Sequence, residues 1–437
     1  MAKRPTSVEI RTYQVGFGDC FLLSFVYSDK DRRHVLIDFG TTGLPGRTAT
    51  PKTHMPKIAN HIKSVCGAAG LTAVVATHRH ADHINGFGTD GKTGKSGSII
   101  AGLTPTLVVQ PWTEDPAARR DAKKATTGSP RSKKSFVAGL AAMNDVAGMI
   151  ARIATNPPPW MSASLQKELM FLGMDNIANK SAVENLIGMG RRKGAKAVFA
   201  NHGSKSGLEK LLPGVKVHVL GPPDLTQTEK IRKQRSRDPD QFWQLISGGA
   251  AMHGKNLLST GFASGSNGKS NPVPPSARWF RDRLERLNGQ QLLEIVRTLD
   301  QQMNNTSLIL LFEVFGKKLL FPGDAQIENW SYAFEDAPDA EKTKALLAEV
   351  DVYKVGHHGS LNATPKQGLW ERFRKRDKGL KTLISTMPGK HGSSRSHTEV
   401  PRKTLLNELE TRSSLQNTMT LKISDKGDPC HVLKIKP

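Results

Sequence analysis

Four side chains able to bind a metal ion lie within six consecutive residues of this chain. They are His78, His80, Asp82 and His83. Residues two positions apart on extended backbone face the same side, so His78 and His80 are expected to point together. Imidazole and carboxylate groups without a nearby cysteine are typical of catalytic Zn, Mn or Fe sites. We interpret the run as a metal-binding cluster, and the alternative, an ordinary polar loop, is disfavoured by this density of ligand types.

Two later segments supply the carboxylate and the imidazole that a pair of metal ions needs in addition. An apolar stretch at 319–321 leads into a Gly-Asp-Ala sequence, which places Asp324 at the tip of a predicted strand. A second apolar stretch, 352–355, leads into His-His-Gly-Ser at 357–360. Alone, either segment would be interpreted as a turn. Together with the first cluster they predict a complete metal site.

The order of these motifs resembles the metallo-β-lactamase family. His-x-His-x-Asp-His, Gly-Asp-Ala and His-His-Gly-Ser carry the likeness, which is greatest to the soluble hydrolase domain of competence-type DNA-uptake channel proteins. The further matching segments are Val15-Gly16-Phe17-Gly18-Asp19-Cys20, Ile37-Asp38-Phe39-Gly40 and Asn304-Asn305-Thr306-Ser307. Phe17 stands where this subgroup usually has Gln. The likeness covers about residues 8–110 and 300–430 and leaves most of the middle of the chain unexplained.

Carried over residue by residue, the resemblance implies two divalent metal ions, with Zn²⁺ favoured over Mn²⁺ or Mg²⁺. The implied metal ligands are His78, His80, Asp82, His83, Asp324 and His358. Within this set the two leading histidines would hold one ion, Asp82 and His83 the other, and Asp324 would bridge them. His357 is expected as a catalytic or neighbouring group, with the reverse assignment of His357 and His358 left open.

The family's middle histidine has no clear match in this sequence. His202 is the first candidate, and His218 and His253 are weaker ones. A histidine at any of these positions is more often simply part of the surface or the core.

Further residues are implied on the substrate side of the site. The segment after 383–386 resembles the subgroup's closing strand and histidine, so His397 is expected to be catalytic, an exposed loop histidine being the equal alternative. The expected substrate-binding residues are Ser360, Ser394 and Arg395. A guanidinium fork such as that of Arg395 matches the geometry of phosphate oxygens.

The chemistry implied is hydrolysis by a water that two metal ions activate. Two cations lower the pKa of a shared water and supply hydroxide at neutral pH. Asp82 is expected to orient this water, while His357 or His397 protonates the leaving group. No organic cofactor is required.

Alternating strands and helices are expected to position these residues. Strand patterns cover 8–15, 20–27, 34–38, 71–77, 215–220, 307–314, 318–321, 350–355 and 381–385, and a helix pattern covers 55–65. The metal-binding motifs follow strand ends, where layered α/β folds place their functional groups. We therefore predict an α/β fold, and the resemblance implies a four-layer αββα metallo-β-lactamase-like sandwich with a basic inserted region.

Length and charge limit the organisation and the partners of the chain. Its 437 residues suit one large domain with insertions. We expect 1–112 and 305–437 to form the two halves of a hydrolase domain and 113–304 to form a basic, partly helical and loop-rich insertion. Lysine and arginine number 63 against 39 acidic residues, a net charge of +24 that favours a phosphate-rich partner.

A nuclease is therefore the first functional prediction, with DNA favoured over RNA by the resemblance alone. A hydrolase of small phosphodiesters, such as cyclic nucleotides, is the alternative within the same fold. A nucleic-acid-binding subunit without catalysis is the second alternative.

Cysteine usage and hydropathy predict a cytoplasmic chain without a membrane segment. Cys20, Cys66 and Cys430 are scattered without the spacing of a disulfide framework or a thiolate zinc site. A phosphate-loop pattern occurs at 86–93, but the preceding strand is predicted to end at His78 and glycine-rich sequence follows Lys92, so nucleotide binding there is disfavoured.

Overall fold

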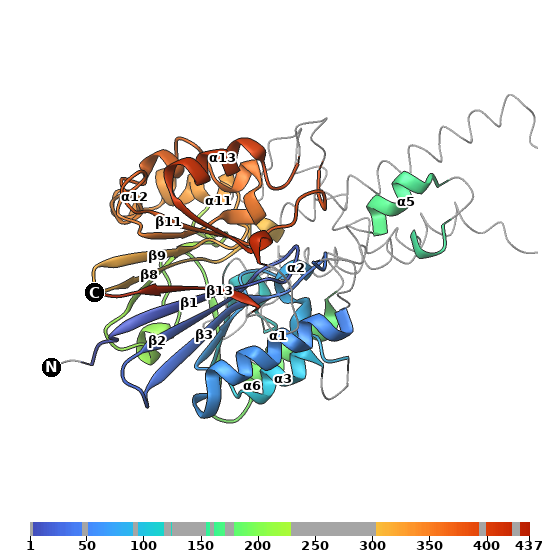
Figure 1. Ribbon diagram of the computed structural model, residues 1–437, viewed down its shortest axis with the longest axis horizontal. Helices are drawn as coiled ribbons and strands as arrows, with labels where there is room; N and C mark the ends of the chain where they lie inside the picture. Colours follow the sequence, from blue (N-terminus) through green and yellow to red (C-terminus); the bar gives the residue numbers. More distant parts are fainter. Residues whose placement is uncertain are drawn as a thin grey trace, which may run out of the picture.

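Two mixed β-sheets with helices packed against them form the structure (Figure 1). The computed structural model describes residues 3–45, 51–90, 95–117, 124, 154–157, 161–170, 179–228, 303–392, 399–421 and 429–437. The predicted α/β class is confirmed. No helix in these ranges is both long enough and apolar enough to cross a membrane.

The first sheet has the strand order β13-β1-β2-β3-β4-β5-β6. Its strands are β1 (Ser7–Tyr13), β2 (Cys20–Val26), β3 (Arg32–Phe39), β4 (Ala73–Val75), β5 (Leu107–Pro111), β6 (Lys196–Ala200) and β13 (Cys430–Ile435). Strands β13 to β3 pair antiparallel, whereas β3 to β6 pair parallel. The parallel half therefore collects the carboxyl ends of several strands at one edge.

The second sheet has the strand order β12-β11-β10-β9-β8-β7. Its strands are β7 (Lys216–Gly221), β8 (Ile309–Val314), β9 (Lys317–Phe321), β10 (Val352–Lys354), β11 (Lys381–Ile384) and β12 (Ser414–Asn417). Strands β9 to β12 run parallel, and β7 and β8 pair antiparallel at the other end. This sheet, like the first, has a shared carboxyl edge.

Helices lie on the sides of the two sheets that face away from each other (Figure 1). Against the first sheet pack α1 (Pro51–Cys66), α3 (Ser96–Gly102) and α6 (Lys180–Arg191). Against the second pack α11 (Ile327–Ser331), α12 (Ala340–Ala348) and α13 (Lys403–Arg412). The remaining α-helices of the described ranges are α2 (Ala81–Ile84), α5 (Ala163–Met170) and α7 (Leu208–Leu211).

An apolar core joins the two sheets face to face. Phe21 of β2 meets Phe321 of β9 with ring centroids 5.8 Å apart. Strand β3 contributes side chains to two cores. Val35 and Ile37 pack in the core between the sheets, whereas Leu36 packs in the core beneath α1. Alternate residues of a strand point to opposite faces, so a strand buried on both faces needs a continuous apolar run.

Part of the stretch expected as an insertion, 113–304, belongs to the two sheets. Strand β6 pairs with β5 in the first sheet, and β7 pairs with β8 in the second. The predicted boundaries at 112 and 304 therefore exclude β6 and β7 from the two-sheet domain. The pattern of β6 is short and begins at Lys196 with little apolar alternation, so no strand was predicted there. The strand of β7 was predicted at 215–220 but was assigned to the insertion. Residues 229–302 of that stretch lie outside the described residues.

Candidate metal centre

The residues of the candidate site follow the carboxyl ends of parallel strands in both sheets. In the first sheet, Asp38 lies near the end of β3 and Thr77 follows β4. In the second sheet, Asp324 follows β9, His358 follows β10 and the backbone of Ser385 follows β11. Because the sheets pack face to face, segments far apart in sequence meet at these strand ends.

Close backbone packing fixes the segment that carries Asp82 and His83. A Cβ atom added to Gly40 would collide with the carbonyl oxygen of Ala81, so only glycine fits at the end of β3. The backbone N–H of Asp19 donates to the carbonyl oxygen of Asp82 at 2.8 Å. The segment is therefore held from two sides.

The histidine pair after β10 has an uncommon backbone conformation. His357 has a φ of 44° and His358 a φ of 52°, in the left-handed region that side-chain-bearing residues rarely adopt. Such conformations persist where the surroundings over-determine them, and they concentrate at functional sites. Here the conformation gives the two adjacent imidazoles different environments, because His358 is fully buried whereas the His357 side chain is 25% exposed.

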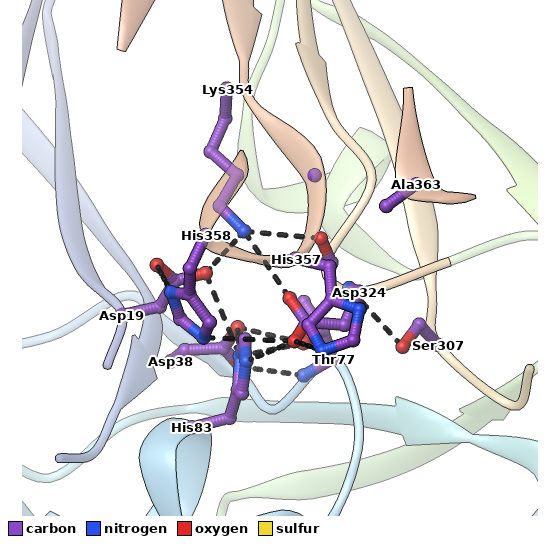
Figure 2. A network of polar contacts seen from close by, with 12 residues as sticks. Asp19, Asp38, Thr77, His83, Ser307, Asp324, Lys354, His357, His358 and Ala363 are labelled. Atoms are coloured by element: carbon purple, nitrogen blue, oxygen red, sulfur yellow. Dashed lines mark hydrogen bonds and ion pairs between the residues drawn. The ribbon is translucent and has the colours of Figure 1, made fainter. Parts of the chain in front are cut away.

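Four buried side chains form a group that could hold a metal ion: Asp82, His83, Asp324 and His358. Their ligand atoms all lie within 4.8 Å of one another. Nε2 of His83 is 3.1 Å from Oδ2 of Asp324 (Figure 2). Nε2 of His358 is 3.1 Å from Oδ2 of Asp82. The structure thus brings together four of the predicted ligands, from three separate segments.

Outer partners orient both imidazoles of this group. Nδ1 of His83 lies 2.7 Å from Oδ2 of Asp38, and the backbone N–H and hydroxyl of Thr77 both donate to Asp38 at 2.7 Å. Nδ1 of His358 lies 2.9 Å from the carbonyl oxygen of Ser385, which can only accept. Each Nδ1 therefore carries a hydrogen, and each Nε2 faces the carboxylates, as in metal-ligating histidines.

The buried carboxylates of the group fit a cation. Among the described residues, Oδ1 of Asp82 makes no hydrogen bond although it is shielded from water, and the oxygens of Asp324 make ion-pair contacts only. Buried polar atoms are nearly always paired, and an unpaired one needs an explanation such as a missing ion. The oxygen and nitrogen donors present suit a divalent cation of the zinc or manganese type.

The pKa values of the group reflect mutual neutralisation in the metal-free protein. Burial lowers the pKa of His83, but Asp324, Asp38 and Asp82 outweigh it and raise that pKa well above its usual value. Burial likewise opposes a raised pKa at His358, which Asp324 and Asp19 produce. Burial also raises the pKa of Asp82, yet His83 and His358 hold it far below its usual value.

The pair His78 and His80 lies beside this group. Nε2 of His78 is 3.0 Å from Nδ1 of His80, and the ring centroids of His78 and His83 are 4.1 Å apart. Burial, His83 and His80 lower the pKa of His78 well below its usual value, so it is neutral, the form that binds metal. Within the described ranges, no third ligand-type side chain forms a set of three with this pair.

His202 does not reach the metal-binding group. Its Nδ1 lies 2.9 Å from the carbonyl oxygen of Leu220, and its Nε2 lies 2.8 Å from Oδ1 of Asp339. Both ring nitrogens are thus used elsewhere, so the candidate His202 is part of the packed structure, the alternative that the sequence favoured for it. His218 lies on β7, 3.8 Å from Glu313, and His253 is outside the described residues.

The structure describes two of the remaining predicted site residues, His357 and Ser360. Nε2 of His357 lies 3.8 Å from Oδ2 of Asp324, at the edge of the group. The Ser360 hydroxyl donates to Asn362 at 3.3 Å. Ser394, Arg395 and His397 lie outside the described residues.

Phe17, the residue that departs from the subgroup's pattern, packs against the centre. Its ring centroid is 4.4 Å from that of His358 and 4.3 Å from that of His391, and its side chain is buried. Burial lowers the pKa of His391 to about 4 despite the opposing effect of Asp82. His391 therefore lies next to the centre, in contact with the same Phe17 ring as His358.

Four residues around the centre had no role predicted from the sequence: Asp19, Asp38, Lys354 and Ser385. Asp19 and Asp38 stand inside the two N-terminal motifs that carried the resemblance, so their signal was present. Lys354 stands in an otherwise apolar stretch, and a charged residue in a buried strand pattern is itself a signal of pairing. Ser385 acts through its backbone, which no side-chain pattern reveals.

Asp38→Asn is expected to weaken metal binding about 10- to 100-fold, the usual cost of losing an outer partner of a histidine ligand. The change keeps the shape but removes the charge that orients Nδ1 of His83. Competition with a chelating dye measures the affinity. Asp339→Asn is the matched control, because Asp339 also contacts a histidine ring but away from the centre. Equal affinities in the two variants would contradict the role of Asp38.

A cavity of about 880 Å³ adjoins the segment that carries the ligands. Ala81, the residue before Asp82, lines it together with Thr41, Gly43, Asn85, Lys95 and Glu184. Its size is that of a pocket for a small organic ligand, and its lining mixes polar and apolar groups.

Comparisons with known proteins add no family to these observations. No protein-family model matches the chain, and no curated protein matches it either. The sequence motifs and the geometry of the centre therefore carry the functional argument.

Proposed function

We propose that this chain is a metal-dependent hydrolase that cleaves phosphodiester bonds of nucleic acid. The carrying observation is the buried group Asp82, His83, Asp324 and His358, whose imidazoles are turned inward by outer partners. A buried group of this kind is costly to a fold unless an ion or a proton balances its charge. Two facing sheets with helices outside support a four-layer αββα metallo-β-lactamase-like sandwich as the fold.

Two divalent cations, with Zn²⁺ favoured over Mn²⁺ or Mg²⁺, are proposed for the centre. Asp82, His83 and His358 would hold one, His78 and His80 the other, and Asp324 would contact both. When bound, such ions supply an activated water and polarise the bond to be cut. The two proposed sites would be unequal, because the first would draw on a group of four ligand-type side chains and the second on two imidazoles.

Two residues of the chain would move protons and orient water in the proposed reaction. Oδ1 of Asp82 makes no hydrogen bond within the described residues, so it is available to accept one from a water. His357 is the more exposed imidazole of its pair and lies at the edge of the centre, so it suits protonation of a leaving group. Imidazole is the side chain best suited to this near neutral pH.

Charge favours nucleic acid as the substrate. The net charge of +24 over 437 residues produces a positive field that attracts polyphosphates. Phosphate contacts supply most of the non-specific affinity of a protein for DNA. DNA is placed ahead of RNA only by the resemblance of the motifs.

Binding to DNA is expected to weaken steeply with salt. For about 6–10 phosphate contacts, the affinity should fall about 10³- to 10⁵-fold between 50 and 200 mM salt. Fluorescence anisotropy with labelled single- and double-stranded DNA in chelator measures binding without cleavage. Degradation assays with Zn²⁺, Mn²⁺ and Mg²⁺ on DNA and RNA complete the test. If metal-loaded protein leaves every polymer intact, the nuclease proposal is wrong.

A small phosphodiester is the second candidate substrate, because the cavity beside Ala81 has the size of a small-molecule pocket. Cyclic nucleotides would be cleaved with little dependence on salt, whereas nucleic acid would not be cut. A non-catalytic nucleic-acid-binding subunit is the third candidate. Metal content near zero after growth with added zinc would favour it over both enzymes.

A further inference from the structure

A buried ammonium group lies beside the proposed metal centre. Lys354, at the end of β10, has a side chain that is 3% exposed. Its Nζ forms an ion pair with Oδ2 of Asp19, donates to the carbonyl oxygen of Gly323 at 3.0 Å, and lies 3.5 Å from Oδ1 of Asp324 (Figure 2). An ammonium group has three N–H donors, and here three acceptors surround it.

Asp19 holds this ammonium group from the opposite sheet. Its backbone is fixed on both sides, because its N–H donates to Asp82 at 2.8 Å and its carbonyl oxygen accepts from Gly40 at 3.0 Å. Its Oδ1 also lies 3.5 Å from Nδ1 of His358. Lys354 therefore joins a rigid carboxylate of the first sheet to the turn after β9 in the second.

The two oxygens of Asp324 face different partners. Oδ1 faces Lys354 at 3.5 Å, whereas Oδ2 faces His83 at 3.1 Å and His358 at 3.6 Å. Lys354 also holds the carbonyl oxygen of Gly323, whose φ of 56° makes the turn that presents Asp324. The ammonium group thus acts on both the side chain and the backbone of this turn.

We propose that Lys354 is a positioning residue, which together with Asp19 orients Asp324 so that one carboxylate oxygen faces the ligand imidazoles. This inference rests on the proposed function only in taking Asp324 as a metal ligand. Partners that hold a metal-binding carboxylate typically change metal affinity 10- to 100-fold. The required pairing also explains why a lysine is buried in an otherwise apolar strand.

A positioning role and a purely electrostatic role of Lys354 predict opposite changes in metal affinity when its ammonium group is removed. A positive charge near a cation site repels the cation, so removing an ammonium group that acted only by charge would tighten metal binding. Removing one that orients a ligand would weaken it. Lys354→Met keeps the length and apolar stem of the side chain while removing the charge, so it separates the two.

The test is a Co²⁺ titration of the full chain, followed by visible absorption, because the spectrum reports the coordination of the ion. Lys354→Met is expected to raise the Co²⁺ dissociation constant at least about tenfold and to alter the absorption bands. Lys381→Met removes a charge from β11, the neighbouring strand, and is expected to bind Co²⁺ as the unmodified protein does. An unchanged or lower dissociation constant in Lys354→Met overturns the inference.

A double variant controls for destabilisation of the fold in Lys354→Met. Lys354→Met leaves Asp19 buried without its ammonium partner, which strongly destabilises a fold. Lys354→Met with Asp19→Asn removes both charges, and it is still expected to show the raised dissociation constant because nothing holds Oδ1 of Asp324. A normal dissociation constant in the double variant overturns the inference.

Thermal unfolding in chelator provides a readout that needs no metal. Lys354→Met is expected to lower the unfolding temperature, and adding Asp324→Asn in that background should restore part of the loss, because the second change removes an unneutralised carboxylate. Strictly additive effects overturn the contact. If the unmodified protein binds no Co²⁺, the proposed function is wrong. The comparison of the single and double variants in chelator still decides whether Lys354 holds Asp324.

Discussion

Asp324→Asn is expected to abolish metal-dependent hydrolysis and to weaken metal binding by more than about 100-fold. Loss of an outer partner alone costs about 10- to 100-fold, and Asp324 is proposed to contact both ions directly. Its Oδ2 lies within 3.6 Å of the Nε2 atoms of both His83 and His358, so its loss removes a ligand oxygen that faces two imidazoles. Elemental analysis after dialysis and a phosphodiester cleavage assay measure the two effects.

Folding must be separated from metal loss in this variant. Asparagine keeps the size of the side chain, but Asp324 also neutralises His83 and His358, so the variant is expected to lose some stability in chelator. Circular dichroism below the unfolding temperature of the variant shows whether it is folded when metal content is measured. The exposed Asp339, changed to Asn, should keep both metal and activity. Full metal content in Asp324→Asn would exclude this residue as a ligand.

In chelator, the stability of the protein is expected to fall as the pH rises above about 6.5. Carboxylates raise the pKa values of His83 and His358 in the folded state despite the opposing effect of burial. A raised folded-state pKa gives stability that is complete below the unfolded-state pKa and is lost as the pH rises through the folded-state pKa. Each imidazole can contribute up to about 1.4 kcal/mol per pH unit.

Metal ions are expected to reverse this dependence. A bound cation replaces the imidazole protons, so binding releases protons and is tighter at higher pH. Thermal unfolding at pH 6 and pH 9, with chelator and with Zn²⁺, measures the effect. His358→Gln should reduce the pH dependence in chelator because it removes one of the two titrating groups. Equal unfolding temperatures at both pH values in chelator would show that these imidazoles do not neutralise the centre.

In chelator, the folded protein is also expected to lose stability at acid pH. His83 and His358 hold the pKa of Asp82 far below its usual value despite burial. Its contribution to stability is therefore present above the unfolded-state pKa of about 3.9 and disappears as the pH falls through the folded-state pKa. The metal-free protein should be most stable between these two limits.

Local sequence patterns determined most of the strands and the ligand types of this protein. The strands predicted at 20–27, 307–314 and 318–321 correspond to β2, β8 and β9, because apolar runs bounded by turn residues depend on nearby sequence. The run 78–83 has four ligand types in any fold. Asp324 and His358 were also found from the sequence, because each follows an apolar strand directly.

Only the tertiary structure decided which of these residues meet and what holds them. His202 had the right chemistry, yet its ring lies against Leu220 and Asp339, and no sequence pattern contains that contact. Strand β6 joins the first sheet although its own pattern is weak, because pairing with β5 supplies what its alternation lacks. The partners Asp38, Asp19 and the Ser385 backbone lie far from His83 and His358 in sequence. Ligand identity is a local property, whereas ligand orientation depends on contacts between two sheets that only folding brings together.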